Sequence, residues 1–246
     1  EHQLLSSQNS LYLGKFKWNI NVAYQNALRK LQTTLDVPFV EMNLNTITYE
    51  SKLYLPSNDK SEYIIGLQGM SQNNRNLNNR ASQFLPNANI NNMGFLGLAQ
   101  YTFFKKLKLQ GGLRFDLYKT ETFALGIEGT SSYHAPVNKE FSSLNGSIGT
   151  TYNVNKKLMF RSNFAKGYRV PNLSELTSNG MHGNRYEIGN ENLSPENSFE
   201  TDLSMHYHGE FLSFDLAGFY NQINDYIFIS PTTDTTPTGV GIDRKS

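Results

Sequence analysis

The stretch from Asn179 to Tyr186 holds the residues whose types and spacing are best suited to bind a ligand. It reads Asn-Gly-Met-His-Gly-Asn-Arg-Tyr. Met181 and His182 carry donor atoms for a metal or a haem iron, and Arg185 can pair with an anionic chelate. The competing interpretation is a glycine-rich surface loop with an incidental histidine, because one histidine without a second ligand at fixed spacing is not a metal site. Met181, His182, Arg185 and Tyr186 are therefore candidates for a ligand site, and no metal site is assigned.

Cationic and amide side chains elsewhere form a second set of candidates. Arg169 lies two residues before Pro171 and could steer an anionic chelate by its charge. Asn73, Asn74 and Arg75 open an asparagine-rich stretch whose amides could contact a ligand or an outer sugar layer. Ordinary polarity and a solvated loop are the competing explanations for these four residues.

Two histidines also share a spacing that permits chemistry. His206 and His208 are two positions apart, so in a strand they lie on one face and could hold a metal. We favour the alternative that both belong to the polar lining of a wet interior.

Catalysis and nucleic-acid binding find little support. Asp116, Glu121 and Glu128 suggest a two-carboxylate glycosidase, but nothing fixes their separation. The sequence has no glycine-rich phosphate loop, serine elbow or HExxH motif. It also lacks cysteine, and its formal net charge of +1 gives no basis for binding nucleic acid. We expect neither an enzyme nor a bound cofactor.

The elements that must position these residues are strands with a long period-two alternation. Between Tyr12 and Tyr24 the even positions are apolar or aromatic apart from Gly14, while the odd ones include lysine and asparagine. The stretches 107–117 and 199–208 repeat this alternation. Strands that cross a bilayer need about 9–11 residues with one apolar and one polar face, so the alternation favours membrane-spanning strands. The wholly apolar runs are too short for a transmembrane helix.

Nine strands are predicted from these patterns: 11–28, 41–55, 61–72, 93–104, 107–121, 141–154, 157–170, 198–208 and 212–229. Bacterial barrels use even numbers, so we expect either a fragment, which we favour, or a partial strand before Ser10. Residues 232–246 predict an interrupted loop.

The connections between these strands alternate in length. Four are short, at 56–60, 105–106, 155–156 and 209–211, and four are long, at 29–40, 73–92, 122–140 and 171–197. Outer-membrane barrels have short periplasmic turns and long extracellular loops, whereas hairpins in water have short connections at both ends. The sorting predicts a membrane barrel in which 11–28, 61–72, 107–121, 157–170 and 212–229 run outward.

Several runs between Phe160 and Pro231 match one known family in their order and spacing. They are Phe164–Pro171, Leu173–Leu176, Tyr186–Glu196, Phe199–Glu200 and Phe219–Ile227, and Gly111–Asp116 is a further recurrent strand. In these runs the chain resembles the barrel of TonB-dependent outer-membrane receptors.

The resemblance implies an all-β fold, an antiparallel up-and-down transmembrane β-barrel wall of about nine to ten strands from a larger barrel of about 22. Residues 1–246 would then be one partial barrel domain in the bacterial outer membrane. It implies TonB-driven uptake of a scarce solute, with a metal complex (siderophore, haem or zinc) favoured by the His182 loop. The implied partners are outer-membrane lipid, that ligand, and the TonB complex through a plug domain not found in this chain. A passive pore and a soluble β-sandwich or barrel that binds carbohydrate remain the alternatives.

Overall fold

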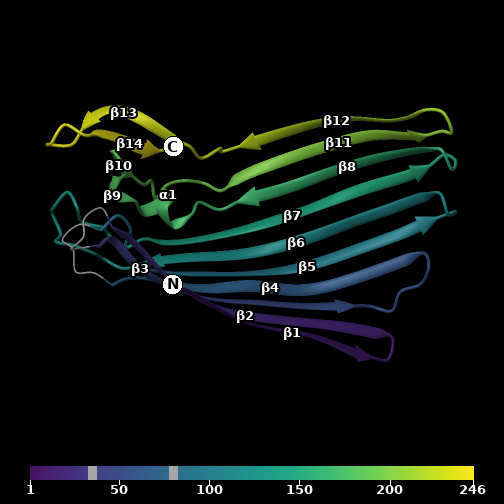
Figure 1. The fold of residues 1–246 in the computed structure, drawn as a ribbon, viewed down its shortest axis with the longest axis horizontal. Helices are drawn as coiled ribbons and strands as arrows, with labels where there is room; N and C mark the ends of the chain where they lie inside the picture. The colour runs from purple at the N-terminus through teal and green to yellow at the C-terminus, as the bar shows by residue number, and fades with distance from the viewer. Residues whose placement is uncertain (33–37, 78–82) are drawn as a thin grey trace.

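The computed structural model describes residues 1–32, 38–77 and 83–246, in which ten antiparallel strands form one sheet (Figure 1). Each strand pairs with its neighbour in the order β1-β2-β3-β4-β5-β6-β7-β8-β11-β12. The strands are β1 (His2–Leu13), β2 (Phe16–Gln32), β3 (Pro38–Tyr54), β4 (Ser61–Asn76), β5 (Ala88–Phe103), β6 (Leu107–Thr122), β7 (Asn138–Asn153), β8 (Leu158–Arg169), β11 (Glu196–His208) and β12 (Ser213–Asn224). This architecture confirms the predicted all-β, up-and-down wall of nine to ten strands.

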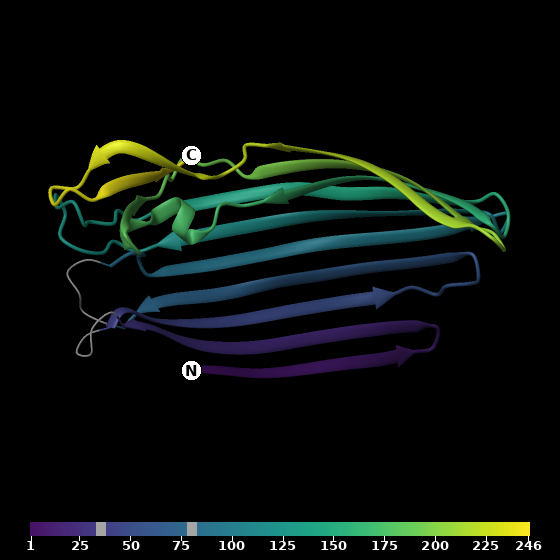
Figure 2. The same ribbon diagram turned by 45° about the horizontal axis from the view of Figure 1, so that its top comes forward.

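The two ends of the sheet differ in the elements that connect its strands. Short turns at 14–15, 55–60, 104–106, 154–157 and 209–212 lie together at one end. The opposite end carries the short helix α1 (Leu173–Thr177) and four short strands: β9 (Asn179–His182), β10 (Arg185–Ile188), β13 (Ile229–Thr235) and β14 (Gly241–Lys245) (Figure 2). Within the described residues, no helix is long and apolar enough to cross a membrane.

The first predicted strand, 11–28, is wrong, because two strands meet inside it. Gly14 has a φ of +63° and opens a two-residue turn, so Leu13 pairs with Phe16 across a hairpin. Glycine at the first central position is what a type II′ hairpin turn favours. The strand added to the nine predicted ones, β1, thus runs from His2 to Leu13, and Tyr12 belongs to it rather than to β2.

Other predicted boundaries also need correction. The connection 29–40 is not long: β2 and β3 extend to Gln32 and Pro38, helped by pairing of Lys30 with Glu41 at 2.6 Å. Residues 33–37 lie outside the described part. At the other end of the chain, β12 stops at Asn224, before Asp225 with a φ of +53°, instead of running to 229. Residues 232–246 contribute to β13 and β14 rather than to a loop. No local pattern predicts these strands, because β13 pairs with β14 and β14 pairs with the distant β10.

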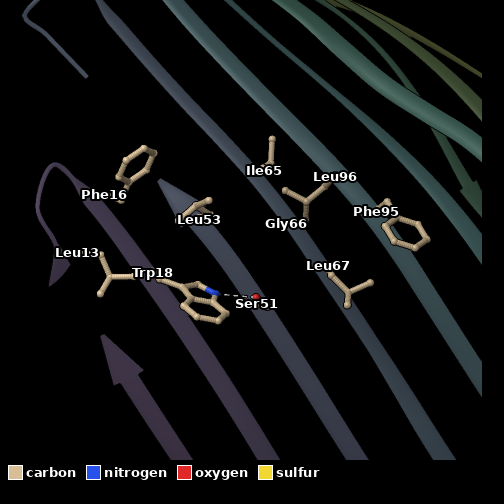
Figure 3. Close-up of a pocket in the computed structure, with 10 residues that line it drawn as sticks. All are labelled: Leu13, Phe16, Trp18, Ser51, Leu53, Ile65, Gly66, Leu67, Phe95 and Leu96. Carbon is tan, nitrogen blue, oxygen red and sulfur yellow. Dashed lines mark hydrogen bonds between the residues drawn. The ribbon is translucent and has the colours of Figure 1, made fainter. Parts of the chain in front are cut away.

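The register places apolar side chains on one face of the wall and leaves them exposed. Phe16 is 40% exposed and Leu203 is 62% exposed, while polar residues such as Asp202 and His206 alternate with them on the other face. On the apolar face a groove of about 680 Å³ runs between aromatic and aliphatic side chains (Figure 3). Two polar side-chain groups that line this groove satisfy each other, since Trp18 Nε1 donates to Ser51 Oγ at 2.8 Å. A face of this kind suits hydrocarbon better than water.

Candidate ligand site in the outer loops

Three connections at the loop end of the wall contact one another. Residues 83–87, 123–137 and 170–195 meet around His134, which is 4% exposed. Its Nδ1 lies 3.1 Å from the carbonyl oxygen of Thr177 and its Nε2 lies 2.7 Å from that of Gln83. Asn179 extends the contact, because its backbone N–H donates to Phe84 and its amide donates to Tyr133. The cluster gives the loop after α1 a fixed position over the wall.

Helix α1 is anchored to the wall by Arg169. Asn172 caps the helix with its side chain and Glu175 completes a capping box. Arg169 Nη1 then donates to Glu175 at 2.8 Å, and its Nη2 and Nε donate to Glu196, each at 2.7 Å. Glu196 also accepts from the backbone N–H of Ile227 at 2.7 Å, which ties in the exit from β12. Two carboxylates therefore hold the guanidinium of Arg169, and a ligand anion would have to displace one of them.

The candidate residues after α1 form a hairpin with two distinct faces. Met181 pairs with Tyr186 and His182 pairs with Arg185 across β9 and β10. Adjacent residues in a strand point to opposite faces, so Met181 and His182 cannot bind one ion together. Tyr186 uses its hydroxyl to donate to Asn179 on the Met181 side, and burial raises its pKa. The structure thus brings His182 and Arg185 together and separates them from Met181 and Tyr186.

The face that carries His182 and Arg185 is a cluster of charged pairs, called here the ion-pair face: His182, Arg185, Glu187, Asp243 and Lys245. His182 Nδ1 lies 2.6 Å from Glu187, and Arg185 Nε donates to Asp243 at 2.8 Å. Lys245 Nζ lies 2.9 Å from Glu187, and both are largely buried.

The strand β14 supplies two of the five residues of the ion-pair face, because it pairs in parallel with β10. The side chains of His182 and Arg185 remain 64% and 52% exposed. Burial alone would raise the pKa of Glu187, but hydrogen bonds from Lys245 and His182 hold it below its ordinary value. The face therefore offers an imidazole and a guanidinium to solvent, each oriented by a carboxylate behind it.

Sequence reasoning missed Glu187, Asp243 and Lys245. Asp243 and Lys245 fall in the stretch predicted as an interrupted loop, so no local pattern pointed to them. No three histidine, aspartate or glutamate side chains converge to hold a metal ion anywhere in residues 1–32, 38–77 and 83–246.

The remaining candidates lie away from the ion-pair face. Asn73 and Arg75 are on the same face of the wall as the apolar side chains, where Asn73 donates to Asn89 and Arg75 donates to Asn89 and the carbonyl of Ala88. Asn74 faces the opposite side and is 3% exposed. The structure does not join these three residues to the ion-pair face.

His206 and His208 lie on the polar face near the short turns, as the sequence predicts. His206 Nδ1 lies 2.6 Å from Asp215, and its Nε2 lies 3.0 Å from Ser204 Oγ. His208 Nε2 lies 3.9 Å from the same aspartate. Both nitrogens of His206 already have polar partners, which fits the polar lining better than a metal site.

The polar face of the wall also carries a charged pair at its centre. Arg114 and Asp116 contact each other at 2.6 Å, and both lie over Gly94. A Cβ at Gly94 would collide with Asp116 Oδ1 and Arg114 Nη2. A polar recess of about 460 Å³ adjoins this pair, lined in part by Asn21, Glu50 and Gln68.

We predict that Gly94→Val lowers the free energy of unfolding by about 1 kcal/mol, because it displaces the flexible ends of the paired Arg114 and Asp116 side chains. Gly97→Val is the matched control, since a Cβ at Gly97 meets no heavy atom within 4 Å. The measurement is urea unfolding of the whole receptor in lipid vesicles, followed by circular dichroism of its β-sheet. Equal losses for the two variants would contradict the close approach at Gly94.

Solved structures with the same fold are described as receptors and transporters. The Serratia marcescens hemophore receptor HasR, solved as a double mutant with its hemophore HasA and heme, superposes with a TM-score of 0.75 at 14% identity, over 99% of this chain and 43% of that chain. The copper transporter OprC gives 0.71 at 15% identity, over 100% and 41%. The siderophore receptor PirA from Acinetobacter baumannii gives 0.68 at 15% identity, over 99% and 40%. The chain thus spans less than half the length of these structures, whose likeness at such identity shows the fold.

The family itself is shown by sequence. A family model described as TonB dependent receptor-like, beta-barrel, matches residues 5–244, nearly the whole chain. This match confirms the resemblance carried by the runs between Phe160 and Pro231. TonB-dependent receptors are transporters of the bacterial outer membrane and not enzymes. The chain therefore belongs to the family of TonB-dependent receptor-like β-barrels.

Proposed function

We propose that this chain is part of the barrel of an outer-membrane receptor that takes up a scarce solute, driven by the TonB system. The edges of β1 and β12 have no strand partner among the described residues. An open edge in lipid costs several kcal/mol for each unpaired backbone group. Further strands of the same receptor must therefore close the wall, which makes residues 1–246 a partial barrel domain. We infer that a plug domain outside this chain links it to the TonB complex.

The solute that the site supports best is an anionic metal complex. The observation that carries this proposal is the ion-pair face, where Arg185 and His182 are exposed to solvent at the loop end of the wall. An anionic chelate can replace Asp243 as the partner of the Arg185 guanidinium. The Nε2 atom of His182, on the side of the ring away from Glu187, can accept a hydrogen bond or coordinate a metal ion. Three of the solved structures with this fold bind or carry haem, copper or a siderophore by their descriptions. The proposed solute is a siderophore, haem or a zinc complex, the last because an imidazole such as that of His182 is a common zinc ligand.

The first test is uptake by a deletion strain that expresses the full receptor from a plasmid. Growth is measured on single sources of iron, haem, copper and zinc, with and without a functional TonB complex. We expect one metal source to require both the receptor and TonB. Uptake that persists without TonB would favour a passive pore instead.

The second test concerns the residues of the ion-pair face. We expect Arg185→Gln to lower the affinity for the transported complex about tenfold, because a charge-assisted hydrogen bond is lost. Arg244→Gln is the matched control. Arg244 is also an exposed cation on β14 beside β10, but it lies on the face opposite to the ion-pair face. Equal affinities of wild type and Arg185→Gln for the radiolabelled complex, measured by equilibrium binding, would show that the ion-pair face does not bind the solute.

A further inference from the structure

A row of asparagine side chains crosses four strands on the apolar face of the wall. Asn26 pairs with Asn45, Asn45 with Asn73 and Asn73 with Asn89, so the four side chains lie side by side on β2, β3, β4 and β5. Asn26 donates to Asn45 at 2.7 Å and Asn73 donates to Asn89 at 2.9 Å. These four residues are called the amide row below.

The amide row marks a change of environment along that face. Four positions nearer the short turns along each strand, the same face presents Val22, Tyr49, Met93 and Leu117. Polar groups on the lipid side of a barrel are destabilising within hydrocarbon and are tolerated near its interface. The amide row lies toward the loop end, which is extracellular in barrels of this kind. It therefore faces the polar layer of the outer leaflet.

Arg75 adds a positive charge beside the amide row. It lies on the same face, where its guanidinium donates to Asn89 Oδ1 at 2.6 Å and to the Ala88 carbonyl at 2.8 Å. Its Cζ sits 5.3 Å from the centroid of the Phe123 ring, which fixes the plane of the guanidinium. Among the described residues, no carboxylate lies within ion-pair distance of Arg75. An anion outside the protein is the natural partner for this charge.

We propose that the amide row and Arg75 bind the phosphorylated sugar headgroup of an outer-leaflet glycolipid. Amide groups donate to and accept from sugar hydroxyls, and a preoriented guanidinium matches a phosphate. The charge and the amides thus complement the two chemical parts of one headgroup. The proposal rests on the proposed place of the chain in the outer membrane, and it is independent of the transported solute.

The test uses the intact receptor in lipid nanodiscs. Binding is measured for a phosphorylated glycolipid carrying its core sugars, for the same glycolipid after removal of its phosphates, and for phosphatidylglycerol. We expect Arg75→Gln to weaken binding of the phosphorylated glycolipid about tenfold, because a charge-assisted contact to phosphate is lost. Its binding of the dephosphorylated glycolipid should stay unchanged. Asn45→Val should weaken both glycolipids by about threefold to tenfold, since the amide contacts sugar.

Matched controls separate the amide row from general polarity. Lys15→Gln removes an exposed cation from a turn at the opposite end of the wall, and Asn153→Val removes an amide from the polar face. Neither change should alter glycolipid binding. Unchanged binding in Arg75→Gln, or an equal loss for phosphatidylglycerol, would overturn the proposal. Solute uptake by Arg75→Gln is measured in parallel, because normal uptake with altered glycolipid binding keeps the proposed function apart from this inference.

Discussion

Placing an arginine at Leu113 should lower the free energy of unfolding in lipid vesicles by about 2–4 kcal/mol, the cost of a cation near the middle of the lipid face of a barrel. Leu113 lies midway along β6 on the apolar face, and its side chain is 65% exposed. In hydrocarbon the guanidinium would lose its water without gaining a partner. The measurement is denaturant unfolding of the protein inserted in vesicles.

Gln110→Arg is the control for this prediction. Gln110 lies on the same strand but on the polar face, where it is exposed. A cation there keeps its water, so the change should stay within about 0.5 kcal/mol. If Gln110→Arg were the more damaging of the two, the polar face rather than the apolar face would be the one in hydrocarbon.

Replacing Lys245 by methionine should detach β14 from β10. Lys245 and Glu187 are 7% and 9% exposed, and their pairing at 2.9 Å is the buried contact between the two strands. Removing one partner of a buried pair costs up to about 3–5 kcal/mol, and Glu187 would keep only the exposed imidazole of His182 as a side-chain partner. Protection of the β14 amides, measured by hydrogen exchange, should therefore be lost.

The same contact predicts a dependence on pH. Because the pKa of Glu187 is lowered in the folded loop, its stabilising effect is present above the ordinary carboxyl pKa of about 4.3 and is lost as the pH falls through the lowered value.

Arg244→Met is the matched control for Lys245→Met on β14, since the exposed pair of Arg244 with Asp234 at 3.4 Å contributes little. Retained protection in Lys245→Met, or equal loss in Arg244→Met, would show that the buried pair does not hold the strand.

The sheet was predictable from the sequence because each strand repeats one local rule. A side chain that alternates between hydrocarbon and a wet lumen leaves a period of two, as along β6 from Leu107 to Leu117. The same rule misplaced the first strand, since Gly14 and Tyr12 happen to continue the alternation of β2 through a turn. It also stopped β2 too early, because polar pairs such as Lys30 and Glu41 continue the ladder beyond the apolar band.

The candidate site was predictable only in part, for a different reason. Arg185 and His182 stand in one short run that composition and spacing can single out. Their partners Asp243 and Lys245 lie more than fifty residues away and meet them through a parallel strand pairing, which no local pattern encodes. The separation of Met181 from His182 follows from the strand conformation of a segment that was predicted as a loop.

On this account one face of each strand meets hydrocarbon and the other face meets water. The accessibility of single positions along β6 to probes in the bilayer and in water tests that arrangement most directly. The chain has no native cysteine, so single cysteines from 107 to 117 can each carry a spin label in a receptor whose remaining sequence is kept free of cysteine, inserted in vesicles. Labels at the odd positions, including Leu109, Leu113 and Phe115, should collide with oxygen dissolved in the bilayer. Labels at the even positions, including Gln110 and Asp116, should collide with a water-soluble nickel chelate. Accessibility to the nickel chelate at the odd positions, or no alternation at all, would contradict the account.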